Sequence, residues 1–135
     1  MVLLEWTPKL SVGIKKIDDQ HKYFIKLLNK ADDTVKAKKK NELIKELPEL
    51  LNYARTHFST EEEIFDKYSY PYSNEHKLEH LKLLEKAVKF YDKATVEKEV
   101  GEELMLFLKD WLENHLKKHD FKYAKYFKDN KIKVE

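Results

Sequence analysis

Apolar side chains recur along most of this chain at alternating steps of three and four residues, the spacing of a helix that buries one face. The pattern predicts four helices of similar length, at about 18–38, 41–66, 74–92 and 96–117, and a short helix at about 120–128. The expected core-facing positions of the four long helices are Ile17, His21, Phe24, Leu28, Ala31 and Val35; Leu43, Leu47, Leu50, Ala54, His57, Glu61, Ile64 and Tyr68; His76, His80, Leu83, Ala87 and Phe90; and Val100, Leu104, Leu108, Trp111 and His115.

Local signals indicate where these helices begin and bend. Asp18 lies near the start of the first helix, and Ser73 and Thr95 are of the residue types that cap a helix N-terminus. Pro48 lies inside the second helix, where its ring removes one backbone hydrogen bond, so we expect either a kink or a late helix start. Residues 68–73 have the composition of a turn.

Amphipathic helices of similar length with short connections predict an all-α, up-down-up-down four-helix bundle. We expect residues 1–17 to form an N-terminal arm, residues 18–118 the bundle, and residues 119–135 a short C-terminal helix and tail. No repeat or linker divides the chain, so we predict one domain spanning residues 1–135.

The composition agrees with this fold and excludes several classes of protein. The 135 residues include 27 Lys+Arg against 25 Asp+Glu, a net charge of +2, so we expect no nucleic-acid or anionic-membrane partner. The absence of cysteine excludes disulfide frameworks, thiolate metal sites and thiol catalysis. Because the chain shows neither a signal peptide nor an apolar run long enough to cross a membrane, we expect a soluble, cytoplasmic protein, with a monomer favoured.

The six histidines are the unusual feature of the composition. Five of them, together with one glutamate, fall on the predicted core faces, where unpaired polar groups cost several kcal/mol. They lie near the starts of the first and third helices and the ends of the second and fourth, which meet at one end of an up-down-up-down bundle. We therefore expect one polar layer in the core that contains His21, His57, Glu61, His76, His80 and His115.

The local spacings are those of metal ligands. The pairs His57/Glu61 and His76/His80 are four residues apart, about 40° around a helix, so both members can reach one centre. His115 and Asp120 are five apart, about 140° on a continuous helix. They can share a site only if the fourth helix breaks before Asp120 and the short helix starts there, and Asp is a favoured N-cap residue.

The number of donors then limits the metal. Five imidazoles and two carboxylates exceed what one ion binds, which indicates two ions bridged by the carboxylates. Two octahedral ions offer about twelve positions, and these donors with one bridging oxide or hydroxide leave about one position open for a small ligand. Imidazole and carboxylate suit iron best for redox binding of a small molecule, while zinc and manganese stay open as alternatives.

The candidate ligands lie within four longer runs that follow Trp6. The runs are SVGIKKIDDQH at 11–21, HFSTE at 57–61, HKLEH at 76–80 and WLENHLKKHD at 111–120. In this order and with these separations, they resemble the hemerythrin family, specifically the single-domain bacteriohemerythrin type. The resemblance covers nearly the whole chain.

This resemblance implies reversible O2 binding at a non-haem di-iron centre, with no catalytic residue. It places His76, His80 and His115 on one iron, His21 and His57 on the other, and Glu61 and Asp120 between them. The iron with two histidines would be the open one, where O2, or NO as another small ligand, binds. Residues one helical step from the ligands are then expected to wall an apolar O2 pocket: Phe24, Trp111, Leu112 and Leu116.

Other interpretations stay open at this stage. A di-iron oxidase, peroxidase or nitric oxide reductase is the main alternative, although such sites usually carry more carboxylates. A regulatory module with a structural metal is a third possibility, and a redox partner is compatible with all of them. We interpret His119 as a surface residue or one outside the ligand set. One tyrosine could hydrogen-bond a ligand, without a choice among Tyr23, Tyr53, Tyr68, Tyr123 and Tyr126.

Overall fold

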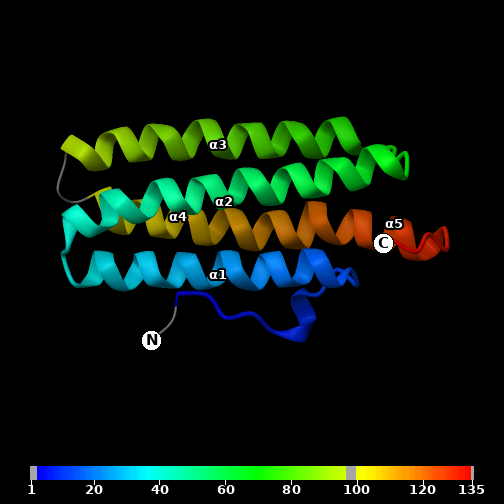
Figure 1. The fold of residues 1–135 in the computed structure, drawn as a ribbon, viewed down its shortest axis with the longest axis horizontal. Helices are drawn as coiled ribbons and strands as arrows, with labels where there is room; N and C mark the ends of the chain where they lie inside the picture. Colours follow the sequence, from blue (N-terminus) through cyan, green and yellow to red (C-terminus); the bar gives the residue numbers. More distant parts are fainter. Residues whose placement is uncertain (1–2, 97–99, 135) are drawn as a thin grey trace.

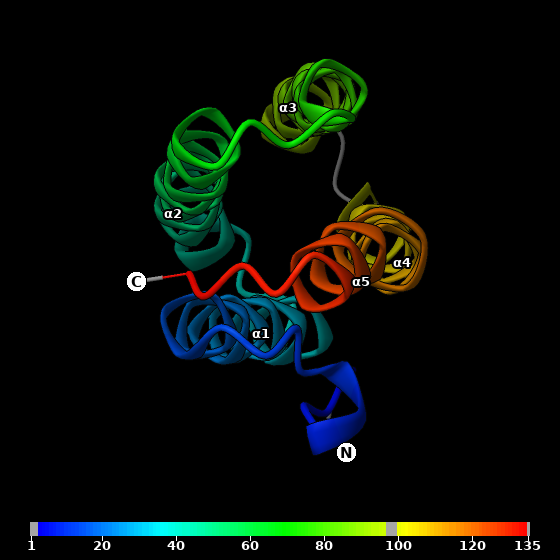
Figure 2. The same ribbon diagram turned by 90° about the vertical axis from the view of Figure 1, so that its right-hand side faces the viewer.

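The chain folds as the predicted up-down-up-down bundle. The structure, a computed structural model, describes residues 3–96 and 100–134. Figure 1 shows that successive long helices run in opposite directions, and Figure 2 shows them around one central axis. The helices are α1 (Lys15–Lys36), α2 (Lys40–Lys67), α3 (Ser73–Val96), α4 (Val100–His115) and α5 (Phe121–Asp129), with a π turn (Leu116–Asp120) between α4 and α5 and a short 3-10 helix (Pro8–Leu10) in the N-terminal arm.

The buried side chains form two apolar clusters. The bundle cluster runs along all four long helices and includes Phe24, Phe58 and Leu116. The end cluster joins Val12, Ile17, Phe65, Tyr70, Tyr123 and Phe127. Along α1, α2 and the π turn, the chain passes from one cluster to the other through a buried polar residue, so a polar layer separates the two clusters. These three polar residues are His21, Glu61 and Asp120.

Three helices end in the same backbone motif. Residues Lys38, Ser69 and Lys131 have φ values of 58°, 54° and 55°, in the left-handed region. After each of them, the next backbone N–H donates to the carbonyl five residues earlier, for example Tyr70 to Phe65 at 2.9 Å. Glycine usually takes this position, but a chain with two glycines uses lysine and serine instead.

Several predicted helix boundaries need correction. Helix α2 runs without interruption from Lys40, so Pro48 does not mark a late start. Helix α3 begins with Ser73 and continues through Thr95 to Val96, so Thr95 does not cap α4. The residues that precede α4, 97–99, lie outside the described part of the chain. Helix α1 begins at Lys15, a turn earlier than expected.

The N-terminal arm is tied to α1 by side-chain hydrogen bonds. Asn29 accepts from the backbone N–H groups of Leu3 and Leu4 at 3.0 and 3.1 Å, and donates to the Leu4 carbonyl at 2.7 Å. Asp18 accepts from the Ser11 hydroxyl at 2.5 Å and from the Val12 N–H at 2.9 Å. Asp18 therefore anchors the arm just before the first core histidine.

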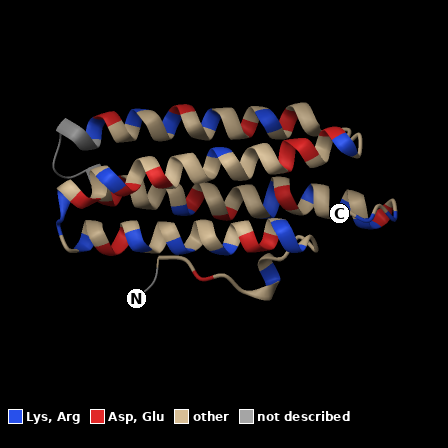
Figure 3. Cartoon of the chain, viewed as in Figure 1, with Lys and Arg blue, Asp and Glu red and all other residues tan. Residues whose placement is uncertain are grey.

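In the view of Figure 3, Lys and Arg alternate with Asp and Glu along the long helices. This interspersed pattern agrees with the small net charge of +2. Among the described residues, no helix combines the length and apolar character needed to cross a bilayer.

Candidate metal centre

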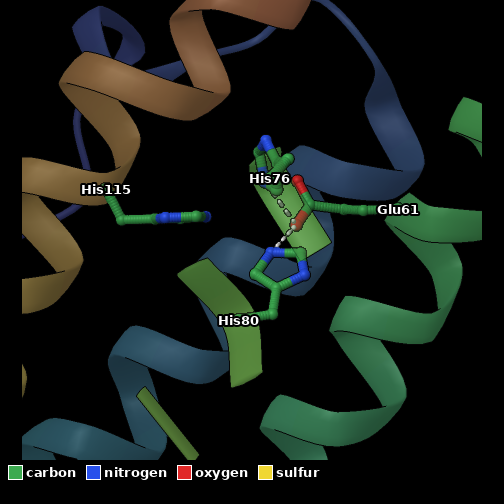
Figure 4. Close-up of side chains that lie close together, drawn as sticks. All are labelled: Glu61, His76, His80 and His115. Atoms are coloured by element: carbon green, nitrogen blue, oxygen red, sulfur yellow. Dashed lines mark ion pairs between the residues drawn. The ribbon is translucent and has the colours of Figure 1, made fainter. Parts of the chain in front are cut away.

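Seven potential metal ligands meet in one layer of the bundle interior, and they come from all four long helices and the π turn. Each of them is at most 5% exposed. Figure 4 shows four of these side chains turned toward one another from α2, α3 and α4. The seven are His21, His57, Glu61, His76, His80, His115 and Asp120.

The three-histidine group consists of His76, His80, His115 and Glu61, whose ligand atoms all lie within 4.8 Å of one another. Glu61 Oε1 is 3.1 Å from His80 Nε2 and 3.7 Å from His76 Nε2. Nitrogen and oxygen donors bind zinc-like ions at about 2.0–2.2 Å, so donors of one ion lie up to about 4.4 Å apart. The spacing of this group is comparable with one bound ion.

The two-histidine group consists of His21, His57, Glu61 and Asp120, and its ligand atoms also lie within 4.8 Å of one another. His57 Nε2 is 3.4 Å from Glu61 Oε1, and His21 Nε2 is 3.2 Å from Asp120 Oδ2. Glu61 thus belongs to both groups, which makes it a natural bridge between two ions.

Asp120 also faces both groups. Its Oδ2 points to His21, while its Oδ1 lies 3.0 Å from His115 Nε2 and 3.1 Å from His76 Nε2. One oxygen of this carboxylate therefore faces the two-histidine group, and the other faces the three-histidine group. An arrangement of this kind suits a bidentate bridge between two metal ions.

The π turn brings Asp120 to the site. We expected the helix to break before Asp120 and that residue to cap the next helix, and this expectation is wrong. Asp120 has helical φ and ψ of −72° and −40° and forms no side-chain cap hydrogen bond. In π geometry the backbone bond joins residues five apart, so His115 and Asp120 lie on one face without a break.

The protein leaves many polar atoms at this site without a hydrogen-bond partner. Each such buried atom costs about 1–3 kcal/mol, so a cluster of them needs a physical explanation. Coordination of metal ions satisfies them together, and the donor set of nitrogen and oxygen fits such ions. The unpartnered atoms that face the centre are Nε2 of His21, His76, His80 and His115, Oε1 of Glu61 and both Oδ atoms of Asp120.

Both carboxylates stay ionised in spite of their burial. Burial by itself raises the pKa of Glu61, but the surrounding imidazoles outweigh it and hold that pKa below its usual range. Burial is likewise outweighed at Asp120, chiefly by His115, and its pKa lies well below the usual value. The protein therefore presents two negative charges to any bound ions.

The same environment shifts the pKa values of two of the histidines in opposite directions. Burial dominates at His57 and lowers its pKa to about 4. At His76 burial is outweighed by the neighbouring carboxylates Asp120 and Glu61, and the pKa rises to about 9. Metal binding must therefore displace a proton from His76, whereas His57 is already neutral near pH 7.

Two polar side chains outside the ligand set hold ligands in place. The buried Tyr123 hydroxyl donates to Glu61 Oε2 at 2.5 Å, which selects one tyrosine from the five that the sequence left undecided. Gln20 Oε1 lies 2.6 Å from Nδ1 of His57. Sequence reasoning missed Gln20, and its position directly before His21 is the signal that could have indicated it.

Aromatic rings hold two ligands of the three-histidine group. Phe58 stacks on His80 with ring centroids 3.8 Å apart and planes 9° apart. Trp111 stacks on His115 at 4.4 Å and 13°. These rings fix the imidazole planes by packing, in contrast to the hydrogen bond at His57.

His119 lies at the edge of the site and belongs to neither group of four. The residue is buried, with 9% of its surface exposed, and its Nε2 lies 3.7 Å from Glu79 Oε2. The rings of His115 and His119 are 5.3 Å apart and tilted by 32°. His119 therefore packs behind a candidate ligand.

A small cavity of about 10 Å³ lies beside the two-histidine group. That volume is close to one water-sized molecule. Three of the four residues expected to wall a pocket line it, namely Phe24, Trp111 and Leu112, together with Phe58, which we did not expect. Leu116 is fully buried in the bundle cluster and is not part of this lining.

Known proteins resemble this chain over most of its length. The family model described as the hemerythrin HHE cation binding domain matches residues 12–127. Bacteriohemerythrin from Methylococcus capsulatus is 34% identical over 126 residues, which cover 92% of this chain and 96% of the relative. Bacteriohemerythrin from Pseudomonas aeruginosa is 30% identical over 124 residues, covering 92% and 81% respectively. A crystal structure of wild-type hemerythrin matches with a TM-score of 0.84 and 33% identity, covering 90% of this chain and 95% of that one.

Proposed function

Because the chain belongs to the hemerythrin family, we propose that it binds O2 reversibly at a non-haem di-iron centre. The observation that carries this proposal is a pair of metal-binding groups that share Glu61. Donors of imidazole and carboxylate type suit iron. Two irons held by these residues, with an oxide or hydroxide between them, would supply reversible two-electron chemistry toward O2.

The ligand assignment follows the two groups. His76, His80 and His115 hold one ion, and His21 and His57 hold the other. Glu61 belongs to both groups and Asp120 faces both, so these two carboxylates would be shared between the two ions. Because the two-histidine group provides one imidazole fewer, an ion held there would have room for a small ligand, and we assign O2 binding to that side.

The small cavity supports this assignment because it adjoins the two-histidine group. Apart from the candidate ligands, its lining consists of Phe24, Phe58, Trp111 and Leu112. These apolar side chains keep water and proton donors away from a bound diatomic molecule. Exclusion of both favours release of unchanged O2 over its irreversible reduction, as a carrier requires.

The chemistry of the lining also favours a binding protein over an enzyme. A di-iron oxidase or peroxidase needs proton delivery to the reacting oxygen atoms. Among the residues that line this cavity, the titratable ones are the candidate ligands His21, His57, His115 and Asp120 themselves. We therefore propose that the protein stores, delivers, scavenges or senses O2 without turning it over.

The function is tested by loading the reduced protein with iron under anaerobic conditions and then cycling O2. We expect a visible charge-transfer band that appears with O2 and disappears when O2 is removed, over several cycles. A protein that gives no reversible band contradicts the proposal. Steady consumption of reductant with O2, peroxide or NO would instead identify an enzyme.

The ligand assignment is tested separately by metal analysis. Glu61→Ala and Asp120→Ala each remove a bridge, so we expect both variants to lose the paired-metal signature. His119→Ala is the matched control, since this neighbouring histidine lies outside both groups, and it should retain two ions per chain. Two ions in either bridge variant, or their loss in the control, would overturn the assignment.

A further inference from the structure

His57 is held differently from three of the other candidate histidine ligands. The outer ring nitrogens Nδ1 of His21, His80 and His115 are buried without a hydrogen-bond partner. Nδ1 of His57 instead lies 2.6 Å from Oε1 of Gln20. Metal-binding histidines usually donate their second ring N–H to such an acceptor, which fixes the ring and its tautomer.

A chain of hydrogen bonds determines which end of the Gln20 amide faces His57. The Thr60 hydroxyl donates its proton to the Thr56 carbonyl at 3.0 Å. Its oxygen is then the acceptor for the Gln20 amide nitrogen at 3.2 Å. The amide nitrogen is thus directed to Thr60, and the amide oxygen must face His57.

This orientation fixes the proton on His57. An amide oxygen accepts but does not donate, so Nδ1 of His57 must carry the hydrogen. The other nitrogen, Nε2, then presents a lone pair toward the centre, where it lies 3.4 Å from Glu61 Oε1. The tautomer that a metal ion needs is therefore already formed in the protein.

We propose that Gln20 and Thr60 are positioning residues, which set the tautomer of His57 and thereby the metal affinity of the two-histidine group. The inference rests on the proposed two-metal centre, since it concerns the side where O2 would bind. Removing a hydrogen-bond partner of this kind costs about 10–100-fold in metal affinity.

The placement of Gln20 links both ligands of this group. It precedes His21 directly on α1, while His57 and Thr60 lie on α2. The rings of His21 and His57 are 4.6 Å apart in an edge-to-face arrangement. The contact between Gln20 and Thr60 therefore positions the two histidines relative to each other across the helix pair.

The first test measures the tautomer in the metal-free protein by ¹⁵N NMR of the histidine rings. Wild type should show the proton of His57 on Nδ1. Thr60→Val removes the hydroxyl that orients the amide, and Gln20→Leu removes the acceptor, so both should give mixed tautomers. The matched control is Thr56→Val, because the Thr56 hydroxyl donates to the Asn52 carbonyl outside this chain of bonds.

The second test is a Co²⁺ titration followed by visible absorption. Wild type, Thr56→Val and the rescue variant Gln20→Glu, which keeps an oxygen acceptor, should bind two ions with similar affinity. Thr60→Val and Gln20→Leu should bind one ion normally and the other about 10–100-fold more weakly. Identical behaviour of Thr60→Val and Thr56→Val in both tests overturns the inference. If both tests give the expected results but the iron-loaded protein shows no O2-dependent band, only the proposed function is contradicted.

Discussion

The two buried carboxylates are the residues that organise this site. Without Glu61 and Asp120, the layer would contain five neighbouring imidazoles and no charge to attract a cation. Each carboxylate lies within 3.1 Å of at least one imidazole nitrogen. Their burial would favour protonation, and the imidazoles reverse this preference. These two residues therefore place negative charge beside the imidazole nitrogens, in an arrangement that can bind metal ions.

Tyr123 supports one of these carboxylates. Tyr123→Phe leaves the ring packing unchanged but removes the donor to Glu61 Oε2 at 2.5 Å. Hydrogen bonds to charged groups contribute about 1.5–3 kcal/mol, so we expect the free energy of unfolding of the metal-free protein to fall by about that amount. Urea unfolding followed by circular dichroism measures the change.

Tyr126→Phe provides the matched control for this prediction. Tyr126 lies on the same helix, and its hydroxyl forms no hydrogen bond among the described residues. The control should unfold at nearly the wild-type urea concentration. Equal stability of the two variants would show that the bond to Glu61 contributes nothing measurable.

At the level of elements, the π turn is the feature that completes the site. The other candidate ligands lie on regular helices, at positions that ordinary helical spacing brings to the core. Asp120 alone depends on a local change of helical pitch between α4 and α5. The change also keeps Leu116 in the bundle cluster and Tyr123 in the end cluster. The π turn therefore serves packing and metal binding together.

We predict that shortening and lengthening this turn by one residue have opposite effects on paired-metal binding. Deleting Lys118 places the aspartate four residues after His115, about 40° away on a regular helix, so paired-metal binding should persist. Inserting one alanine after Lys118 places it six residues away, about 240° around the helix, and should remove one bridge. Metal stoichiometry distinguishes the two variants. The prediction is wrong if the insertion variant still binds two ions.

At the level of the whole molecule, the site forms a polar layer between two apolar clusters. The bundle cluster lies on one side. The end cluster covers the other side and joins the arm, the nearby ends of α1 and α2, the α2–α3 connection and α5. Water is thus excluded from both directions, and the candidate ligands are at most 5% exposed. A buried layer of this kind makes the stability of the metal-free protein sensitive to protonation.

We predict that the metal-free protein loses stability as the pH rises from 6.5 to 9. His76 is faced by Glu61 from α2, by Asp120 from the π turn, and by the rings of His80, His115 and His119. Its pKa is raised from 6.5 to about 9, so its protonated form stabilises the fold fully below pH 6.5. This contribution is lost as the pH rises through 9. Thermal unfolding across this range measures it.

The zinc-loaded protein is the control for the pH prediction. Its ligands are already deprotonated in the folded state, while the histidines of the unfolded chain lose protons above pH 6.5, so its unfolding temperature should hold or rise over the same range. The difference between the loaded and metal-free forms should therefore widen with pH. A metal-free protein that holds or gains stability above pH 6.5 contradicts the prediction.

Much of the fold could be predicted because helical periodicity depends on local sequence. The spacing of apolar residues predicted the four long helices, and short connections predicted their alternating directions. The same periodicity placed five histidines and Glu61 on core faces. The up-down-up-down order of the helices was then enough to predict that these side chains meet at one end of the bundle. Helix ends were harder to predict, because Thr95 has the character of a cap yet lies inside α3.

The sequence by itself therefore determined the bundle, the polar layer and its candidate nitrogen and oxygen donors. Only the tertiary structure decided how Asp120 reaches the layer, which tyrosine contacts Glu61, and which residue orients His57. For Tyr123 and Gln20, the physical reason is that the contacts join different elements, whereas Asp120 depends on the π pitch of the turn, which the periodicity of regular helices does not predict. Gln20 reaches His57 across 37 positions of sequence, and Tyr123 reaches Glu61 across 62. Distances of this kind depend on how the helices pack, and no local pattern of residues encodes them.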